Sequence, residues 1–179
     1  MYGVLRDYLT GEELQDTDDE RIRQDLMRLL VEELGYSRQE LEPRLRIISD
    51  FNSKRVETQI ELTVSVNGKR LFIVRYGAGS LVTREKAAIA AARLLDPAYA
   101  IPFAVVTNSR DAELLDTKTG KVLATGMDCI PSRKQAEKMM QDCIFEPYVD
   151  TEQRERALRI LNVFDEEICC VGLKCNNTE

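Results

Sequence analysis

In the stretch VRYGAGS, Arg75 interrupts an apolar run just before two glycines. A charged side chain late in a buried strand costs free energy unless it is paired or reaches water. One interpretation is an ion pair with an acid such as Glu57 or Glu20. The other is a contact with a bound anion, because a guanidinium can hold a phosphate or a carboxylate bidentately.

The loop after this arginine offers further groups for an anion. Gly77, Gly79 and Ser80 can present backbone N–H groups, and Arg84 lies at the start of an alanine-rich segment. The N-terminus of a helix favours anions. These residues, together with Arg75, form the predicted site for an anion or for nucleic acid, although solvated helix faces also commonly carry arginines.

Histidine is absent from the chain, and the formal net charge is −6. The absence of histidine excludes Ser-His and Cys-His nucleophile pairs and the zinc sites that need histidine. A sequence pI near 5.0 argues against a protein that coats nucleic acid or membranes through overall charge. Any phosphate site must therefore be a local patch.

The five cysteines, at positions 129, 143, 169, 170 and 175, lie in the last third of the chain. Their spacing lacks the paired CxxC units of a zinc or iron–sulfur site. We therefore expect reduced thiols and no metal cluster.

The N-terminal segment is acidic and lacks the apolar core of a signal peptide. No apolar run approaches the roughly 20 residues that span a bilayer. The sequence therefore predicts a soluble, cytoplasmic protein without a membrane partner.

The first long element is a helix over residues 18–34, whose apolar residues recur at helical spacing. Thr17 and Glu20 match the S/T-x-x-E capping box, so Glu20 has a purely structural interpretation. Gly35 is expected to end the helix.

Three antiparallel strands are expected next, the first within PRLRIISDF. Residues 54–66 alternate between apolar and polar types, and the following Asn-Gly is a strong hairpin signal that returns residues 70–76 beside them. A regular two-residue turn places Glu61 opposite Val74. Glu61 and Arg75 are then expected on opposite faces of the sheet unless the strand is bulged.

The second half of the chain continues with an alanine-rich helix over residues 83–95. The apolar run 101–107 predicts a central strand, parallel to its neighbour because a helix connects them. A hairpin turning at Thr119-Gly120 and two further helices complete the pattern. We expect residues 1–130 to form one α/β domain and residues 131–179 a helical extension packed on it.

The segments DDERIRQDLMRLLVEELGY, IELTVSVNGKRLFIVRYGAG and IPFAVVTNSRDAELLDTKTGKVL carry a family resemblance. The chain resembles the N-terminal nuclease domain of type I restriction enzyme R subunits, a branch of the PD-(D/E)XK nuclease superfamily. The resemblance covers roughly residues 10–135. It implies a restriction-endonuclease-like fold, with a mixed central sheet flanked by helices.

In that family, an acid on the second strand and the Glu of a Glu-x-Lys on the third hold magnesium, and the lysine helps to activate water. The resemblance assigns Glu20 to an assisting helix position, Glu61 to the strand-two acid, Arg75 to the Glu and Gly77 to the lysine. A guanidinium repels Mg²⁺, and glycine supplies no ammonium. The resemblance therefore implies the fold and leaves no catalytic residue assigned with confidence.

Three functions follow. The first is an inactive nuclease-like domain that binds nucleic acid or another anion without a cofactor. The second is a Mg²⁺-dependent DNA endonuclease in which Glu57, Glu61 and Asp50 rebuild the metal site, with Glu61 and Glu57 as metal ligands. The third is a protein-interaction module whose C-terminal helices cover a partner or a second copy through Leu158, Leu161, Val163 and Phe164.

Overall fold

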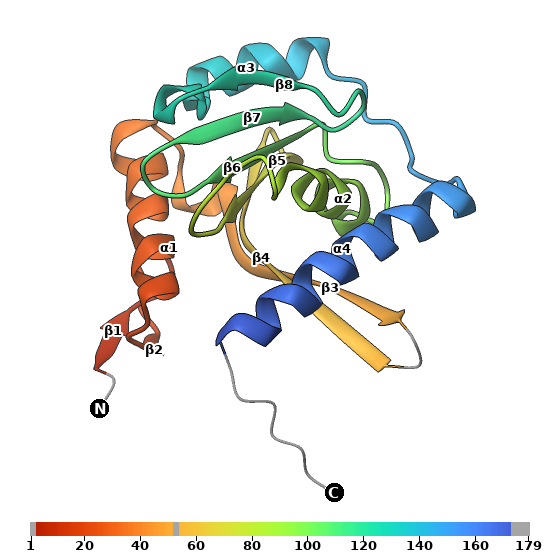
Figure 1. The fold of residues 1–179 in the computed structure, drawn as a ribbon. Coiled ribbons are helices and arrows are strands. Elements are labelled where there is room, and N and C mark those ends of the chain that lie inside the picture. Colours follow the sequence, from red (N-terminus) through yellow and green to blue (C-terminus); the bar gives the residue numbers. More distant parts are fainter. Residues whose placement is uncertain (1–2, 52–53, 173–179) are drawn as a thin grey trace, which may run out of the picture.

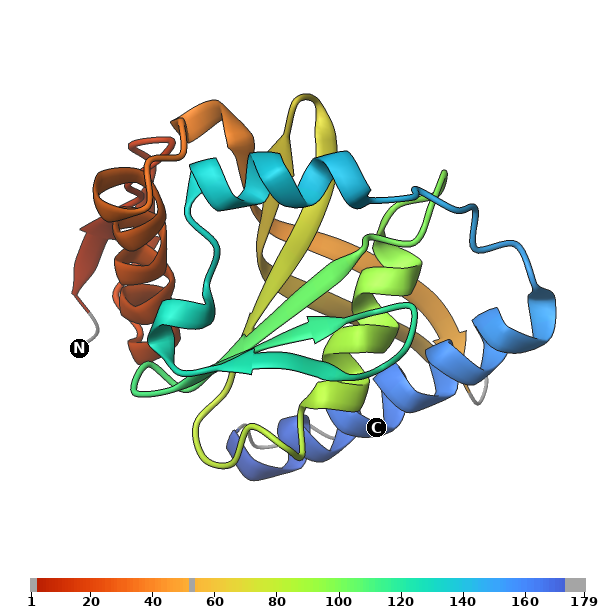
Figure 2. The same cartoon turned by 90° about the horizontal axis from the view of Figure 1, so that it is seen from above.

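A six-stranded sheet forms the centre of the protein, with the strand order β3-β4-β5-β6-β7-β8. The structure is a computed structural model that describes residues 3–51 and 54–172. Helices cover both faces of the sheet (Figures 1 and 2). The strands are β3 (Leu41–Phe51), β4 (Lys54–Val66), β5 (Lys69–Tyr76), β6 (Phe103–Thr107), β7 (Ala112–Asp116) and β8 (Val122–Thr125).

Strand pairing follows the predicted pattern. β3, β4 and β5 pair antiparallel, and β6 lies parallel to β5. The helical connection between β5 and β6 accounts for this parallel pair. β6 is a central strand, since β5 and β7 flank it and Ala104, Val105 and Val106 are buried. The hairpin of β7 and β8 is also confirmed, with Gly120 at a positive φ of 73°.

Alternate residues of the central strands belong to two separate hydrophobic clusters. Val74 and Val105 belong to the cluster that includes the first and third helices. Ile73 and Val106 belong to the cluster on the opposite face. The sheet is therefore the middle of three layers. The polar side of residues 54–66 is not simply exposed to water, because Thr63 on that side is fully buried.

The first helix was predicted over residues 18–34. The structure has α1 over Asp18–Arg28, followed by a π-helical turn over Leu29–Glu33. The chain leaves this turn at Gly35, whose φ is 81°. The helix is amphipathic as expected, because Leu26, Met27 and Leu30 are buried against the sheet.

A short hairpin of β1 (Val4–Arg6) and β2 (Glu13–Gln15) precedes α1 and was not predicted. The carboxylate of Asp7 accepts hydrogen bonds from the backbone N–H groups of Leu9 and Thr10, at 2.9 Å each. Strands this short give too little alternation to be read from the sequence.

The alanine-rich segment forms α2 (Glu85–Leu95), and its small residues are buried as expected. The C-terminal helix α4 (Thr151–Gly172) lies beside α2 on the same face of the sheet (Figures 1 and 2). Ala157 and Leu161 of α4 join the cluster that contains the alanines. The short side chains allow the two helices to approach closely.

The helix α3 (Arg133–Asp142) packs on the opposite face from α2, where Ala136 is fully buried. Residues 143–150 connect α3 to α4 without regular secondary structure. The boundary near residue 130 stays a prediction. Within the described residues, no helix is both long enough and apolar enough to cross a bilayer.

Candidate functional site

Glu61 and Arg75 lie together on one face of the sheet. Pairing of β4 with β5 starts with Ser65 opposite Arg70 and then shifts by one residue, so that Leu62 lies opposite Val74. The shift brings the Nε atom of Arg75 to 3.1 Å from Oε2 of Glu61. The expectation of opposite faces is therefore wrong, because a bulge moves every later residue to the other face.

This ion pair is largely enclosed, with 11% of the Arg75 side chain and 18% of the Glu61 side chain exposed. Burial raises the pKa of Glu61, and the positive charge of Arg75 only partly offsets that effect. Of the two partners considered from the sequence, Glu57 pairs with Arg46, and Glu20 pairs with Arg23 and Arg44. The Glu61 carboxylate thus already has a cation beside it.

A second group of buried charges lies between α1 and the sheet. Glu20 is 8% exposed and pairs with Arg23, while Gln24 donates to its Oε1 atom at 2.8 Å. Arg44 of β3 bridges Glu20 at 3.3 Å and Asp7 at 2.8 Å. Hydrogen bonds from Thr10, Arg44, Gln24 and Leu9 outweigh the effect of burial and lower the pKa of Asp7.

The capping-box interpretation of Glu20 is half right. The Thr17 hydroxyl accepts the Glu20 backbone N–H at 3.2 Å, but the Glu20 side chain points to Arg23, Gln24 and Arg44. The sequence did not point to Asp7, Arg23 and Arg44. Asp7 and Arg44 have partners that are distant in the chain, and Arg23 pairs with Glu20 one helical turn earlier on α1.

The carboxylates that the resemblance assigns to the second strand and to the assisting helix position each lie beside guanidinium groups. Glu61 has Arg75, and Glu20 has Arg23 and Arg44. In the part of the chain that the structure describes, no group of three or more Asp, Glu, Cys or His residues could hold a metal ion. Magnesium prefers several oxygen ligands, which these pairs do not offer as they stand.

Gly77 lies two residues after Arg75, and the guanidinium of Arg84 occupies the space beside it. A Cβ atom built on Gly77 would lie only 2.0 Å from Cζ of Arg84. The backbone N–H of Gly77 donates to the Thr107 carbonyl at 3.1 Å and so continues the pairing of β5 with β6. At the position assigned to the lysine, the cation is thus provided by a residue further along the chain.

The loop between β5 and α2 contains Gly79 and Ser80, two other residues of the predicted anion site. The side-chain amide of Asn108 donates to the Gly79 carbonyl at 2.9 Å, and the Thr83 hydroxyl donates to the Ser80 carbonyl at 3.0 Å. Gly79 has a φ of 96°, which glycine adopts without strain. Gly79 and Ser80 are exposed, so their backbone is accessible to a ligand.

The acids proposed to rebuild a metal site do not gather around Glu61. Glu57 pairs with Arg46 at 2.7 Å, and 43% of its side chain is exposed. Asp50 lies opposite Arg55 further along the same β3–β4 hairpin, which projects away from the rest of the sheet (Figure 1). Each of these two acids thus has an arginine facing it.

A pair of acids near the start of α2 was also missed. Burial raises the pKa of Glu113, and the neighbouring carboxylates of Glu85 and Asp111 raise it further. The Oε2 atom of Glu113 is buried and has no hydrogen-bond partner among the described residues. Glu113 lies opposite Val106, so its side chain shares the face of the sheet that α2 covers.

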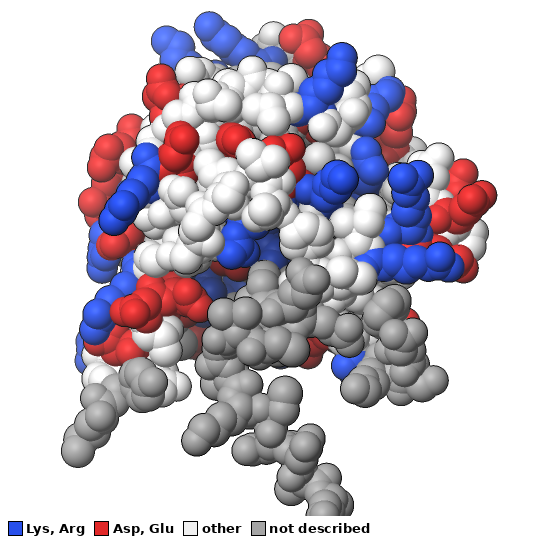
Figure 3. Space-filling model, in the orientation of Figure 1, with Lys and Arg blue, Asp and Glu red and all other residues white. Residues whose placement is uncertain are grey.

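On the face shown in Figure 3, the charged side chains do not form one continuous basic area. Acidic and basic side chains are interspersed over the face shown in Figure 3. Arg84 and Arg93 lie at opposite ends of α2, and Arg93 donates to the carbonyl oxygen of Thr117. Arg93 is thus engaged with the backbone at its own end of the helix, away from Arg84.

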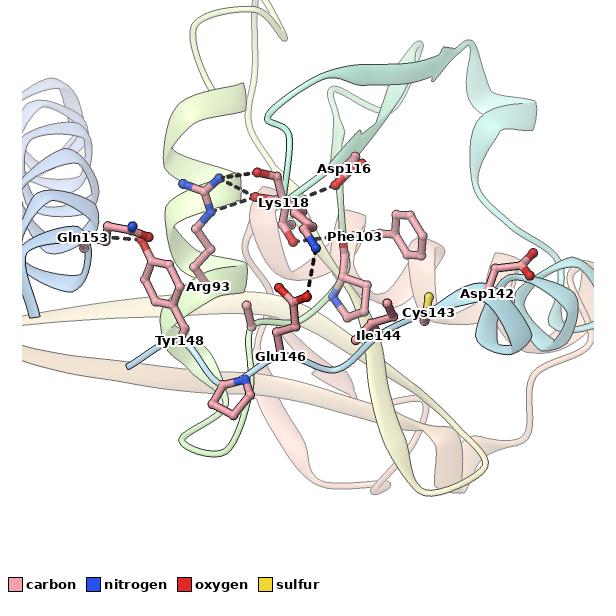
Figure 4. A pocket seen from close by; sticks show the side chains of 14 residues that line it. Arg93, Phe103, Asp116, Lys118, Asp142, Cys143, Ile144, Glu146, Tyr148 and Gln153 are labelled. Atoms are coloured by element: carbon pink, nitrogen blue, oxygen red, sulfur yellow. Dashed lines mark hydrogen bonds and ion pairs between the residues drawn. The ribbon is translucent and has the colours of Figure 1, made fainter. Parts of the chain in front are cut away.

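A cavity of about 440 Å³ lies at the Arg93 end of α2. Figure 4 shows Lys118 and Glu146 pointing toward each other across it, with Nζ and Oε1 2.9 Å apart. Phe103, Ile144 and Tyr148 supply apolar surface to its walls. It is separate from the Arg75 and Arg84 region, because it lies at the other end of the helix.

The cysteines show no paired arrangement among the described side chains. Cys129 is buried and Cys143 is half-buried, and both are free thiols. Burial raises the pKa of each to about 11, so neither is a reactive thiolate at neutral pH. The side chains of Cys169, Cys170 and Cys175 lie outside the described part of the chain.

The mixed sheet, with helices on both faces and a crossover helix between β5 and β6, is compatible with a restriction-endonuclease-like fold. The family model for the type I restriction enzyme R protein N terminus (HSDR_N) matches residues 18–131. The chain belongs to this family, as the resemblance implied. Comparisons with curated proteins and with solved structures gave no match.

Proposed function

We propose that this domain binds nucleic acid through the phosphate backbone and does not cleave it. The ion pair between Glu61 and Arg75 is the observation that carries the proposal. In the nuclease superfamily, both positions hold carboxylates that bind Mg²⁺. Here one of them is a guanidinium, and its charge neutralises the other.

The chemistry of metal-dependent cleavage needs more than one oxygen ligand. A bound Mg²⁺ polarises the phosphate and lowers the pKa of its attacking water. For Glu61 to bind the ion, Arg75 would have to move away from a side chain that it contacts at 3.1 Å. The positive charge of Arg75 repels the metal ion. Separating Arg75 from Glu61 also costs free energy, because it leaves a guanidinium without its partner in an enclosed site.

Binding of nucleic acid is supported by family membership and by the loop after β5. Arg84 places a cation at the end of the sheet, and the exposed backbone of Gly79 and Ser80 lies next to it. Phosphate contacts supply most of the affinity in binding that does not depend on sequence. A formal net charge of −6 means that the affinity must come from this local site.

Cleavage and binding are tested separately. Purified protein is incubated with supercoiled plasmid, linear duplex and single-stranded DNA in the presence of Mg²⁺ or Mn²⁺, and we expect no cleavage. Fluorescence anisotropy with labelled duplex and single-stranded oligonucleotides at two salt concentrations should show binding that weakens with salt. Cleavage that is lost in Glu61→Ala would instead favour a Mg²⁺-dependent endonuclease.

A protein-interaction module is the second candidate function. Val163 of α4 is 47% exposed while its neighbour Leu161 is fully buried, so α4 has apolar surface that α2 does not cover. If the protein fails to bind oligonucleotides at low salt, this candidate becomes the better one. Sedimentation of the wild type and Val163→Asp would then test whether a second copy covers the surface.

A further inference from the structure

We propose that the phosphate is contacted by Arg84 rather than Arg75, and that Gly77 is the positioning residue that makes this possible. The proposal rests on the nucleic-acid binding proposed above and names the residues responsible. Arg75 and Arg84 are both cations near the end of β5. Their surroundings differ, and the difference decides which of them is available to a ligand.

The geometry places the Arg84 guanidinium where a side chain at position 77 would stand. Besides the 2.0 Å approach of Cζ, the Nε and Nη1 atoms would each lie 2.2 Å from a Cβ on Gly77. Side chains alternate along a strand, so positions 75 and 77 point to the same face. The guanidinium of Arg84 therefore lies on the face of the sheet that carries Glu61 and Arg75.

The charge of Arg84 is not balanced by its neighbours. Its Nη2 atom donates to the Ala78 carbonyl at 3.1 Å, and its Nε atom, which is buried, has no acceptor among the described residues. No ion pair links it to a described carboxylate, whereas the charge of Arg75 is opposed by Glu61. An arginine can hold two phosphate oxygens at once, so a phosphodiester is the ligand that fits this group.

Gly77 is needed because any side chain there would expel the guanidinium. The φ angle of Gly77 is not positive, so alanine is compatible with the backbone conformation. The three atoms nearest to the new methyl group all belong to the flexible end of Arg84. Gly77→Ala should therefore displace the cation while leaving the fold and every charge in the protein intact.

The test compares four proteins by fluorescence anisotropy with a fluorescein-labelled DNA duplex at two salt concentrations: the wild type, Gly77→Ala, Arg84→Ala and Lys86→Ala. We expect Gly77→Ala and Arg84→Ala each to weaken binding roughly tenfold, since one charge-assisted contact is lost. Arg84→Ala should also lower the salt slope by about one. Lys86→Ala removes the same charge from an exposed position on α2 and should have a smaller effect on affinity.

The double variant Gly77→Ala/Arg84→Ala should bind no more weakly than Arg84→Ala, because both substitutions remove the same contact between Arg84 and the phosphate. Wild-type affinity in Gly77→Ala would overturn the proposal while leaving nucleic-acid binding in place. A lower melting temperature in Arg84→Ala, with unchanged binding in both single variants, would show that Arg84 is structural. Failure of the wild type to bind would instead overturn the proposed function, and this inference with it.

Discussion

Glu61 faces Arg75 because one extra residue, Leu71, is accommodated in β5. Ser65 pairs with Arg70 and Val64 pairs with Phe72, which leaves Leu71 without an opposite residue on β4. Without this bulge, Glu61 would lie opposite Val74, and the two charges would point to different sides. A shift of one residue therefore decides whether the candidate site contains an ion pair or two unrelated charges.

The first prediction is that Arg75→Ala destabilises the protein. The change leaves Glu61 in an enclosed place without the arginine that opposes its charge. Removing one partner of a buried pair costs about 3–5 kcal/mol, and partial exposure lowers the expected loss to about 1–3 kcal/mol. Urea unfolding at pH 7 measures the change in the free energy of unfolding.

Arg46→Ala is the matched control for this change. Arg46 also pairs with a glutamate of β4, but 56% of its side chain and 43% of the Glu57 side chain are exposed. We expect a loss of about 0–1 kcal/mol, as for other surface pairs. Equal losses in the two variants would mean that the Glu61 pair is not protected from solvent. The double variant Glu61→Gln/Arg75→Gln should lose less than the sum of its single variants.

The second prediction is that Arg75→Glu creates a site for a divalent cation. It places a carboxylate beside Glu61, and like charges this close favour binding of a metal ion between them. We expect Mg²⁺ or Mn²⁺ at millimolar concentration to raise the melting temperature of the variant, because a ligand that binds the folded state stabilises it. The wild type should not respond. Arg46→Glu should respond more weakly than Arg75→Glu, because its carboxylate would join Glu57 at an exposed position. Equal shifts in all three proteins would contradict the prediction.

The fold could largely be predicted because its signals are local. The alternation of 54–66, the Asn-Gly turn and the apolar run 101–107 each report a nearby part of the sheet. The bulge at Leu71 could not be predicted, because both registers keep the same turn. Packing of Phe72 and Val74 in one cluster, with Ile73 in the other, selects the register that the structure has.

The candidate site was harder to predict because its contacts join distant segments. A charge in an apolar strand marks Arg75 as a candidate residue from the sequence, but its partner depends on the bulge. Asp7 and Arg44 meet at 2.8 Å although the β1–β2 hairpin and β3 are separated by the whole of α1. The space at Gly77 is filled from Arg84, and a glycine alone gives no sign of what occupies the place of its side chain.

The third prediction concerns pH and Glu113. Its folded-state pKa is raised, first by burial and then by Glu85 and Asp111. The unfolded chain therefore releases this proton at a lower pH than the folded protein does. The associated stability is present below the unfolded-state pKa of about 4.3 and is lost as the pH rises through the folded-state value.

Glu113→Gln removes this titration. Relative to the wild type, the variant should gain free energy of unfolding as the pH rises from 4 to 7, and the difference curve cancels the titration of groups that both proteins share. Urea unfolding at several pH values provides the curve. Glu137→Gln, on the exposed side of α3, serves as the control and should give a flat difference. A flat difference for Glu113→Gln as well would show that its carboxyl titrates normally.

The fourth prediction tests how firmly α4 belongs to the domain. Leu161 is fully buried among the small residues of α2, whereas Val163, two positions later, is 47% exposed. Truncation of a buried leucine to alanine typically costs 2–5 kcal/mol, because apolar contacts are lost and a cavity remains. Leu161→Ala should therefore lower the free energy of unfolding by about that amount, while Val163→Ala should change it by less than about 0.5 kcal/mol.

Both changes are measured by urea unfolding followed by far-ultraviolet circular dichroism. A single transition with an unchanged slope is expected, since the helix and the sheet share one hydrophobic cluster. If Leu161→Ala instead melts α4 in a separate, earlier transition and leaves the main one in place, the helix is an independent appendage on the sheet.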